Sequence, residues 1–323
     1  MVHQFTHALV TLLTAAALIG SAIASDGLPP MAIEKVGQDV YVVRGQAGQA
    51  SAANAGFISN AGAVATGEGL VVFDTLGTPA LGAKMRKLLE EASGEKVKLV
   101  VVSHYHADHF YGIQAFQGPG VEIIAHPNAE QVFKDANTQN RLAQRQQDLF
   151  PWVSEDTRLV LAARKAKVAP GQNETFQLGR HRFTLIDGLG AHAPDDLMMR
   201  VDNLGVVFAG DLFFTGRVPF VGSANPRVWL AALDRMAEQP PKVAIPGHGA
   251  ISHQPQKDLD LTRRYLDFLS KQMAQAVANL QSFEEAYDSI DWSAFKDLPA
   301  FSAANRLNAH GAYLHAEQDA LKK

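Results

Sequence analysis

The fold of this chain is decided by residues 99–109, which read LVVVSHYHADH. The first four residues form a continuous apolar run, which is typical of a strand buried on both faces. The run leads directly into His104 and His106, and the i, i+2 spacing puts both side chains on the same side of an extended chain. Asp108 and His109 follow a turn later and can face a second cation. The stretch therefore predicts a buried strand that ends in a metal-binding loop.

The composition restricts the chemistry of such a site. The sequence has no cysteine and twelve histidines. Disulfides, thiolate nucleophiles, iron–sulfur clusters and zinc–thiolate sites are therefore excluded. Imidazole nitrogens and carboxylate oxygens remain, and these are ligands that zinc accepts when no thiolate is present.

Other candidate ligands follow predicted strands later in the chain. Each is weak evidence when taken singly, because a lone His or Asp in a loop is more often a cap or a surface residue. Glycines next to Asp211 and on both sides of His248 allow the backbone to approach a cation closely. Because the candidate ligands follow the first motif in this order, we treat them as one set: His192, Asp211 and His248.

This pattern resembles the metallo-β-lactamase superfamily. The H-x-H-x-D-H signature of that family is matched by His104, His106, Asp108 and His109, and its later ligands by His192, Asp211 and His248. The resemblance covers about Val40 to His253. It implies an α/β fold, a four-layered αβ/βα sandwich with the metals at one rim, here with a helical C-terminal extension. By the same likeness, His104, His106 and His192 bind a first zinc ion; Asp108, His109 and His248 bind a second; Asp211 bridges them.

Some details favour one branch of the superfamily. The absence of cysteine excludes the β-lactamases that use a Cys ligand, and His106 stands where flavo-diiron proteins usually place Glu. Asp211 favours the glyoxalase II-like and lactonase-like hydrolases. The strand around Asn54 to Phe57 and a helix from Asn305 to Glu317 also resemble periplasmic zinc metallohydrolases associated with sulfur oxidation and quinoprotein systems.

The function expected from this likeness is that of a dinuclear zinc hydrolase. A metal-bridged hydroxide would cleave an acyl bond in a small molecule, namely a thioester, lactone or lactam. Asp108 or Asp211 would orient the hydroxide and relay a proton, so these two are the candidate catalytic residues. Two zinc ions are the expected cofactors, with iron or manganese as alternatives, because His and Asp suit several metals.

Several alternatives stay open. A periplasmic β-lactamase is favoured by export and disfavoured by Asp211. A nuclease of the same fold would need a basic face, whereas the net charge is −4 and no Lys/Arg run occurs, so we expect no nucleic-acid partner. A non-catalytic metal-binding accessory protein of an envelope redox pathway would not need a complete ligand set. The sequence does not indicate an oligomeric state.

Residues 1–24 are predicted to be a signal peptide. The run from Ala8 to Ala24 is apolar and ends in Ala22-Ile23-Ala24, a small-residue cleavage site. The segment before it has no Lys or Arg, so a retained anchor is the alternative. We expect a periplasmic or secreted protein without stable membrane association after cleavage. Residues 25–254 would form the metallo-β-lactamase-like domain, and 255–323 a helical extension packed on it.

The remaining elements follow from periodicity and turn signals. Strands are expected at Val40–Val43, Ala55–Ile58, Leu70–Phe73, Val121–Ala125, Arg182–Leu189, Leu197–Val201, Val206–Ala209 and Lys242–Ile245. Helices are expected from Pro79 to Ala92, within Ala129–Phe150, at Pro226–Glu238 and after Pro255.

Asp74 is expected either to hold a ligand imidazole or the metal loop, or to cap a turn. Asp195 and Asp196 are expected near the site or in a solvated turn. Substrate choice is expected to depend on loops at 46–53, 130–165 and 213–223.

Overall fold

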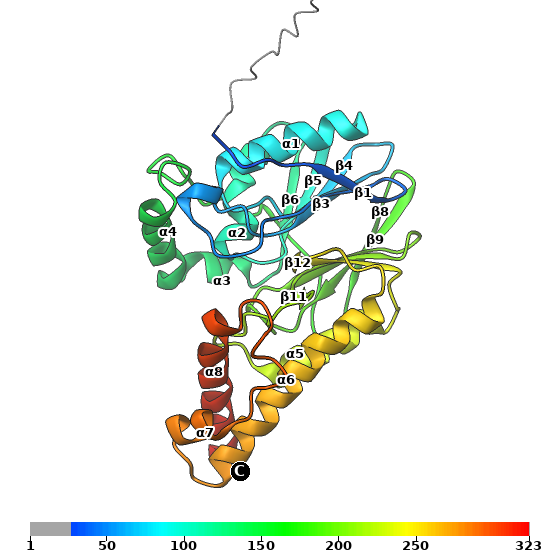
Figure 1. Ribbon diagram of the computed structural model, residues 1–323. Helices are drawn as coiled ribbons and strands as arrows, with labels where there is room; N and C mark the ends of the chain where they lie inside the picture. Colours follow the sequence, from blue (N-terminus) through cyan, green and yellow to red (C-terminus); the bar gives the residue numbers. More distant parts are fainter. Residues whose placement is uncertain (1–26, 323) are drawn as a thin grey trace, which may run out of the picture.

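The computed structural model describes residues 27–322 (Figure 1). The predicted signal peptide at residues 1–24 lies outside this range. Four layers stack on one another: helix α1 (Pro79–Ser93), a seven-stranded sheet, a five-stranded sheet, and the helices α5 (Pro226–Ala237) and α6 (Pro255–Ala278). The predicted four-layered αβ/βα sandwich is therefore confirmed.

The first sheet carries the strand that leads into the histidine motif. Its strands follow the chain in order: β1 (Ile33–Gly37), β2 (Val40–Val43), β3 (Ala61–Ala65), β4 (Leu70–Phe73), β5 (Val97–Val101), β6 (Glu122–Ala125) and β7 (Arg164–Lys165). Pairing is antiparallel up to β4 and parallel from β4 to β7. Helix α1 makes the crossover from β4 to β5, starting at the N-cap Thr78 and ending at Gly94. The crossover brings the carboxyl ends of β4 and β5 to one edge.

The second sheet carries the later ligands. Its order is β12 (Val243–His248), β11 (Val206–Phe214), β10 (Leu197–Val201), β9 (His181–Asp187) and β8 (Glu174–Leu178). Only β11 and β12 are parallel, and α5 connects them. Their carboxyl ends therefore also share one edge.

The main core lies between the two sheets. Along β5, Leu99 and Val101 face the second sheet, while Val100 packs on the opposite side with α1. This alternation follows the period of two of a strand. Phe73 of β4 meets Phe208 of β11 across the layers, with ring centroids 5.4 Å apart. Both faces of β5 are apolar because both are covered.

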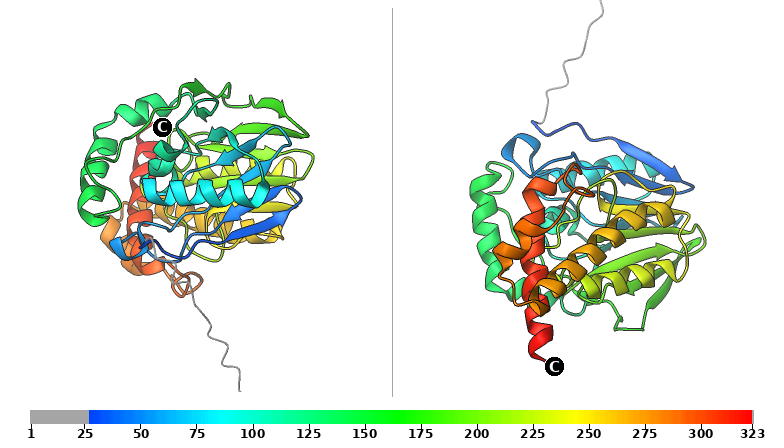
Figure 2. Two further views of the ribbon diagram at one scale, coloured as in Figure 1. Left: turned by 90° about the horizontal axis from the view of Figure 1, so that it is seen from above. Right: turned by 60° about the horizontal axis from the view of Figure 1, so that its bottom comes forward.

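Helices complete the outer surfaces. A segment between β6 and β7 forms α3 (Ala129–Lys134) and α4 (Ala136–Asp148), and three short pieces are η1 (Ala52–Asn54), α2 (Ala107–Phe110) and η2 (Tyr111–Phe116). After α6 come α7 (Phe283–Ser289) and α8 (Phe301–Leu321), which share a core with the second sheet and α5 (Figure 2). Between residues 27 and 322, every helix falls short of the length or apolar character that crossing a bilayer requires.

Some strand predictions were wrong in place or length. The strand expected at Ala55–Ile58 does not form, because Ala55 and Gly56 both adopt positive φ angles, 53° and 73°, that break an extended chain. The strand begins instead at Ala61. Strand β11 continues to Phe214, so Asp211 lies inside a strand rather than at its end.

Candidate metal centre

The motif residues leave the first sheet where β5 ends. His104 is almost completely buried, and α2 then places Asp108 in its first turn and His109 in its last. Tyr105 and Phe110, both buried with ring centroids 4.4 Å apart, anchor this loop in the core. These two aromatic residues lie before and after His106, Asp108 and His109 in the sequence, so they hold both ends of the segment that carries these ligands.

Two groups of side chains meet at this edge. In the first group, Nε2 of His104 lies 2.9 Å from Nδ1 of His106, which lies 3.0 Å from Nε2 of His192. In the second, Nε2 of His248 lies 3.2 Å from Oδ2 of Asp108, and Nε2 of His109 lies 3.5 Å from the same oxygen. The candidate ligands predicted from the sequence all come together here: His104, His106, His192 and Asp211 in one group, Asp108, His109 and His248 in the other.

Asp211 faces both groups. Its Oδ2 lies 3.4 Å from Nε2 of His192, while its Oδ1 lies 3.1 Å from Nε2 of His109 and 3.4 Å from Nε2 of His248. One oxygen is therefore directed to each group, which is the arrangement of a bridging carboxylate.

These residues fit a pair of cations. Bonds of about 2.0–2.2 Å around a tetrahedral zinc ion would place neighbouring ligand atoms about 3.3–3.6 Å apart. The observed separations are at or slightly below this value. Among the described residues, Nε2 of His109 and Oδ1 of Asp211 are buried without a hydrogen-bond partner, an arrangement that is costly unless an ion takes up both atoms.

Asp74 and Ser103 hold two of the imidazoles. Oδ2 of Asp74 lies 2.9 Å from Nδ1 of His109, and the Ser103 hydroxyl lies 2.8 Å from the same carboxylate oxygen and 2.9 Å from Nδ1 of His104. The Ser103 amide donates to Oδ1 of Asp74. This geometry supports the first of the two roles expected for Asp74. A carboxylate behind a ligand imidazole fixes the ring and raises its basicity.

Asp195 and Asp196 lie behind the ligand loops and not in a solvated turn. Oδ2 of Asp196 accepts from the backbone amides of His192 and Ala193, and Oδ2 of Asp195 accepts from the amide of Tyr105. Burial raises the pKa of Asp195 to about 7 and that of Asp196 well above its usual range. Both carboxyl groups therefore tie chain segments together beneath the centre.

The two groups differ in their electrostatics. Burial lowers the pKa of His106 to about 3 and also lowers those of His104 and His192. Burial acts in the same direction on His248, but Asp211 and Asp108 outweigh it and raise its pKa to about 9. The pKa of His109 is raised for the same reason. The negative field around the second group therefore attracts positive charge, either protons or a cation.

Asp211 can occupy its position between the two ligand groups because glycine backbone packs closely around it. A Cβ atom on Gly247 would lie 1.9 Å from Oδ1 of Asp211, so no larger residue fits there. Gly210, with φ of 52°, packs in the same way against Ser103. The glycines noted beside these ligands in the sequence are thus required by close contacts, that of Gly247 with the neighbouring strand β11 and that of Gly210 with Ser103 of the other sheet.

Other contacts at the centre were not predicted. Nδ1 of His248 lies 2.8 Å from the carbonyl oxygen of Ile58, which fixes that ring. The side-chain amide of Asn60 donates to the carbonyls of Pro246 and Gly249 on either side of His248. No local sequence pattern indicates such contacts, because a backbone carbonyl partner such as that of Ile58 does not depend on the side chain at its position.

Comparisons with known proteins agree with this geometry. The family model described as "Metallo-beta-lactamase superfamily" matches residues 54–248. The inverting sec-alkylsulfatase Pisa1 from Pseudomonas sp. has a similar structure, with a TM-score of 0.69 and 18% identity, over 88% of this chain and 50% of the sulfatase. The chain thus spans about half the length of that enzyme.

Two structures of metallo-β-lactamases match less of this chain. One from Pontibacter korlensis has a TM-score of 0.59 and 18% identity over 74% of this chain and 99% of its own. FIM-1 from Pseudomonas aeruginosa, solved in a mono-zinc form, has a TM-score of 0.56 and 17% identity over 75% and 96%. At these identities the likeness shows the fold alone. A comparison with curated sequences gives no match.

The matched segment covers more than half of the chain and includes all the candidate ligands. The chain therefore belongs to the metallo-β-lactamase superfamily, and its His/Asp centre is that of a metal-dependent hydrolase.

Proposed function

We propose that this protein is a two-zinc hydrolase that cleaves an acyl bond in a small molecule: a thioester, a lactone or a lactam. The observation that carries the proposal is Asp211, whose two oxygens face the two ligand groups. A purely structural zinc site is normally closed around one four-coordinate ion and has no use for such a bridge. This argues against a non-catalytic accessory protein.

A pair of zinc ions supplies Lewis acidity and lowers the pKa of water from about 15.7 to about 7. The chain positions that chemistry. The Asp108 side chain is 22% exposed, whereas those of Asp211 and His248 are 7% and 8% exposed. Asp108 therefore borders the entrance, where its carboxylate can orient an incoming water and accept a proton from it.

Two other substrate classes need to be tested. β-Lactams are included because two of the similar structures are metallo-β-lactamases, while Asp211 favours the lactonase-like and glyoxalase II-like branch. A sec-alkyl sulfate is included because the likeness to the sulfatase extends over 88% of the chain. We also propose that the protein acts after export, on the basis of the sequence of residues 1–24.

The test combines metal analysis with a substrate panel. The exported form, residues 25–323, is assayed with a thioester, a lactone, the lactam nitrocefin and a sec-alkyl sulfate, and its metal content is measured by mass spectrometry. We expect two metal ions per chain and turnover of an acyl substrate. Turnover of the sulfate alone, or none of the panel with metal bound, would refute the acyl assignment.

The variant Asp108→Ala tests whether turnover depends on the metal centre. It removes a ligand atom from the second group, so turnover should be abolished and metal content should fall. The control is Asp156→Ala, which changes an exposed aspartate outside the centre. Full activity of Asp108→Ala would contradict the proposal.

A further inference from the structure

The candidate imidazole ligands differ in what holds the ring nitrogen that faces away from the metal centre. Three of them have an oxygen within hydrogen-bond distance of Nδ1: that of Ser103 beside His104, of Asp74 beside His109 and of Ile58 beside His248. His106 is partly exposed, so water can reach its ring. His192 is different, because its side chain is only 2% exposed and its Nδ1 has no hydrogen-bond partner among the described residues.

The unpartnered atom of His192 is a hydrogen-bond donor when the centre holds metal. Nε2 of His192 lies 3.0 Å from Nδ1 of His106 and 3.4 Å from Oδ2 of Asp211, so Nε2 is the atom that faces a cation. A neutral imidazole that binds through one nitrogen carries its proton on the other. Nδ1 of His192 therefore presents an N–H group in a buried place, and leaving such a donor without an acceptor is costly.

Two aromatic rings outside the ligand set lie against His192. The ring of Trp229 is T-shaped to the imidazole, with centroids 5.2 Å apart and an interplanar angle of 69°. Phe214 is farther away, at 6.4 Å and 61°. The face of an aromatic ring carries negative potential, that of indole most strongly, and it can accept a weak hydrogen bond from an N–H group. Trp229 is therefore the better placed of the two acceptors.

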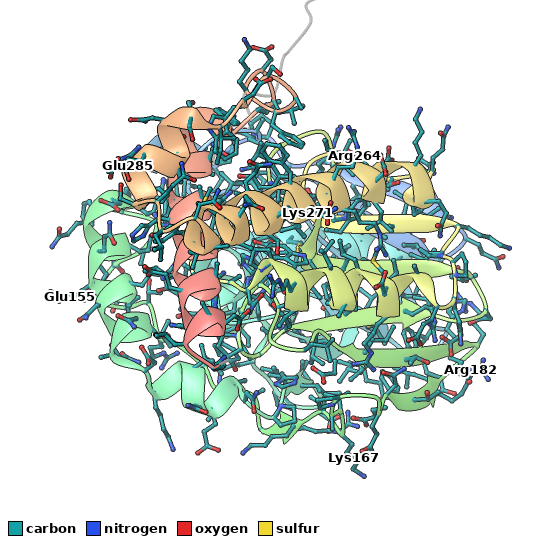
Figure 3. All side chains as sticks on the ribbon, turned by 90° about the horizontal axis from the view of Figure 1, so that it is seen from below. Glu155, Lys167, Arg182, Arg264, Lys271 and Glu285 are labelled. Atoms are coloured by element: carbon teal, nitrogen blue, oxygen red, sulfur yellow. The ribbon has the colours of Figure 1, made fainter. Side chains whose placement is uncertain are left out.

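The indole of Trp229 is itself held in place. It is fully buried, and its Nε1–H donates to the carbonyl of Leu212 at 2.9 Å. Leu212 directly follows Asp211 on β11, while Trp229 lies on α5, which covers the second sheet beside α6 (Figure 3). The plane of the indole is therefore set by the strand that carries the bridging carboxylate, and it cannot turn without breaking this hydrogen bond.

Phe214 extends the same aromatic layer to the second ligand group. Its ring lies 6.3 Å from that of Trp229 and stacks on the imidazole of His248, with centroids 5.5 Å apart and an interplanar angle of 3°. His248, however, already has the carbonyl of Ile58 at its Nδ1. Phe214 therefore packs on a ring that a hydrogen bond holds, whereas the far nitrogen of His192 has only the aromatic rings beside it.

We propose that Trp229 is a positioning residue of the metal centre: the face of its indole accepts the Nδ1–H group of His192 and fixes that imidazole with Nε2 directed at the cation. The inference rests on the two-metal centre of the proposed function and not on the kind of bond that is cleaved. A carboxylate such as that of Asp74 raises the basicity of its imidazole, and an uncharged indole does so much less. His192 is thus a weaker donor, which leaves more Lewis acidity available to a substrate.

Nuclear magnetic resonance of the zinc-loaded protein tests this contact directly. Isotope labelling of the histidine nitrogens gives separate signals for the Nδ1–H protons of His192, His109 and His248. An oxygen acceptor moves such a proton downfield, whereas the face of a ring shields it, so the His192 signal should lie upfield of the other two. It should also show a nuclear Overhauser contact with the ring protons of Trp229. A contact with a bound water instead, or a signal at the same field as the other two, would overturn the inference.

Two substitutions separate the aromatic face from the volume that it fills. Trp229→Leu removes the acceptor, so the His192 signal should move downfield and zinc affinity of the first ligand group should fall about 3- to 10-fold, as measured by competition with a chelating dye. Trp229→Phe keeps an aromatic face and should retain more of the affinity. An equal loss in both variants would show that the volume alone matters and would overturn the inference. The wild-type spectrum remains decisive if Trp229→Leu does not fold.

Trp292→Leu is the matched control. The indole of Trp292 also donates to a backbone carbonyl, that of Tyr287 at 3.2 Å, and its ring packs against Phe268 among the C-terminal helices. Zinc affinity and the His192 signal should be unchanged in this variant. Zinc binding with the contact present but no turnover would support the inference and refute the acyl assignment alone. Turnover without a contact between His192 and Trp229 would overturn the inference alone.

Discussion

Oδ2 of Asp74 lies 2.9 Å from Nδ1 of His109, and this contact turns the other nitrogen of that imidazole toward the metal centre. The same carboxylate accepts from the backbone amide of Ser103, at 2.7 Å. One buried side chain thus links the end of β4, the end of β5 and a ligand on α2. The position of the ligand is set by the two strands of the first sheet.

Replacing Asp74 by Asn should weaken metal binding without unfolding the protein. The amide keeps the shape but loses the charge that raises the basicity of His109, so affinity for zinc should fall about 10- to 100-fold. Competition with a chelating dye measures it. Asp39→Asn is a matched control, because Asp39 also has a positive φ and contacts a histidine, His181, outside the centre. Equal zinc affinity in the Asp74 and Asp39 variants would show that Asp74 does not support the ligand.

Gly247→Ala should displace the bridging carboxylate. The new Cβ would lie 1.9 Å from Oδ1 of Asp211 and 2.8–2.9 Å from backbone atoms that cannot move easily. Both ligand groups use Asp211, so the variant should lose both metal ions, as measured by elemental analysis. Gly118→Ala adds the same methyl group where nothing lies within 4 Å, and it should keep both. Full metal content in Gly247→Ala would contradict the bridging role.

The two ligand groups should respond differently to pH. His106, with its pKa lowered to about 3, and its neighbours in the first group carry no proton at neutral pH, so a cation displaces none there. His248, with its pKa raised to about 9, and His109 are protonated, and a cation must displace those protons. Affinity of the second group should therefore fall about tenfold per pH unit for each proton displaced as pH drops from about 8 to about 6.

Dialysis against buffered zinc at each pH measures this difference. One metal ion per chain should be lost at the acid end while the other is retained. Simultaneous loss of both ions, or no loss of either, would show that the two groups do not titrate separately.

Asn308→Ala should loosen the loop of residues 215–225, which follows β11, because Asn308 bonds to Val221 and Gly222 from α8. The amides of Val221 and Gly222 would lose their acceptor in a buried place, so the free energy of unfolding should fall by about 1–3 kcal/mol in a denaturant titration. Metal content should stay constant, because Asn308 contacts none of the candidate ligands. Asn279→Ala, an exposed residue at the end of α6, is the control. Unchanged stability of Asn308→Ala would show that the loop does not need α8.

The candidate ligands could be predicted because metal chemistry restricts residue types. Without cysteine, the side chains available as transition-metal ligands were those of His, Asp and Glu. The spacing of His104, His106, Asp108 and His109 is typical of few kinds of site other than a metal centre. The fold followed from the apolar run of β5, buried on both faces as expected. Asp74 could be assigned to either of two roles, and only its distance to His109 favoured one.

Backbone conformation and long-range contact could not be predicted. The apolar pattern at 55–58 looked extended, but positive φ angles at Ala55 and Gly56 turn the chain instead. The hydrogen bond between Asn308 and Val221 joins residues more than eighty positions apart in the chain, and no local sequence pattern indicates it. The predicted domain boundaries and the signal peptide stay predictions.

Helix α8 follows every candidate ligand in the chain and fastens the loop of residues 215–225 through Asn308, so the order of synthesis matters. The ribosome completes the candidate metal ligands well before Asn308 emerges. A nascent chain therefore contains the cation-binding residues before it can fix the loop that follows β11.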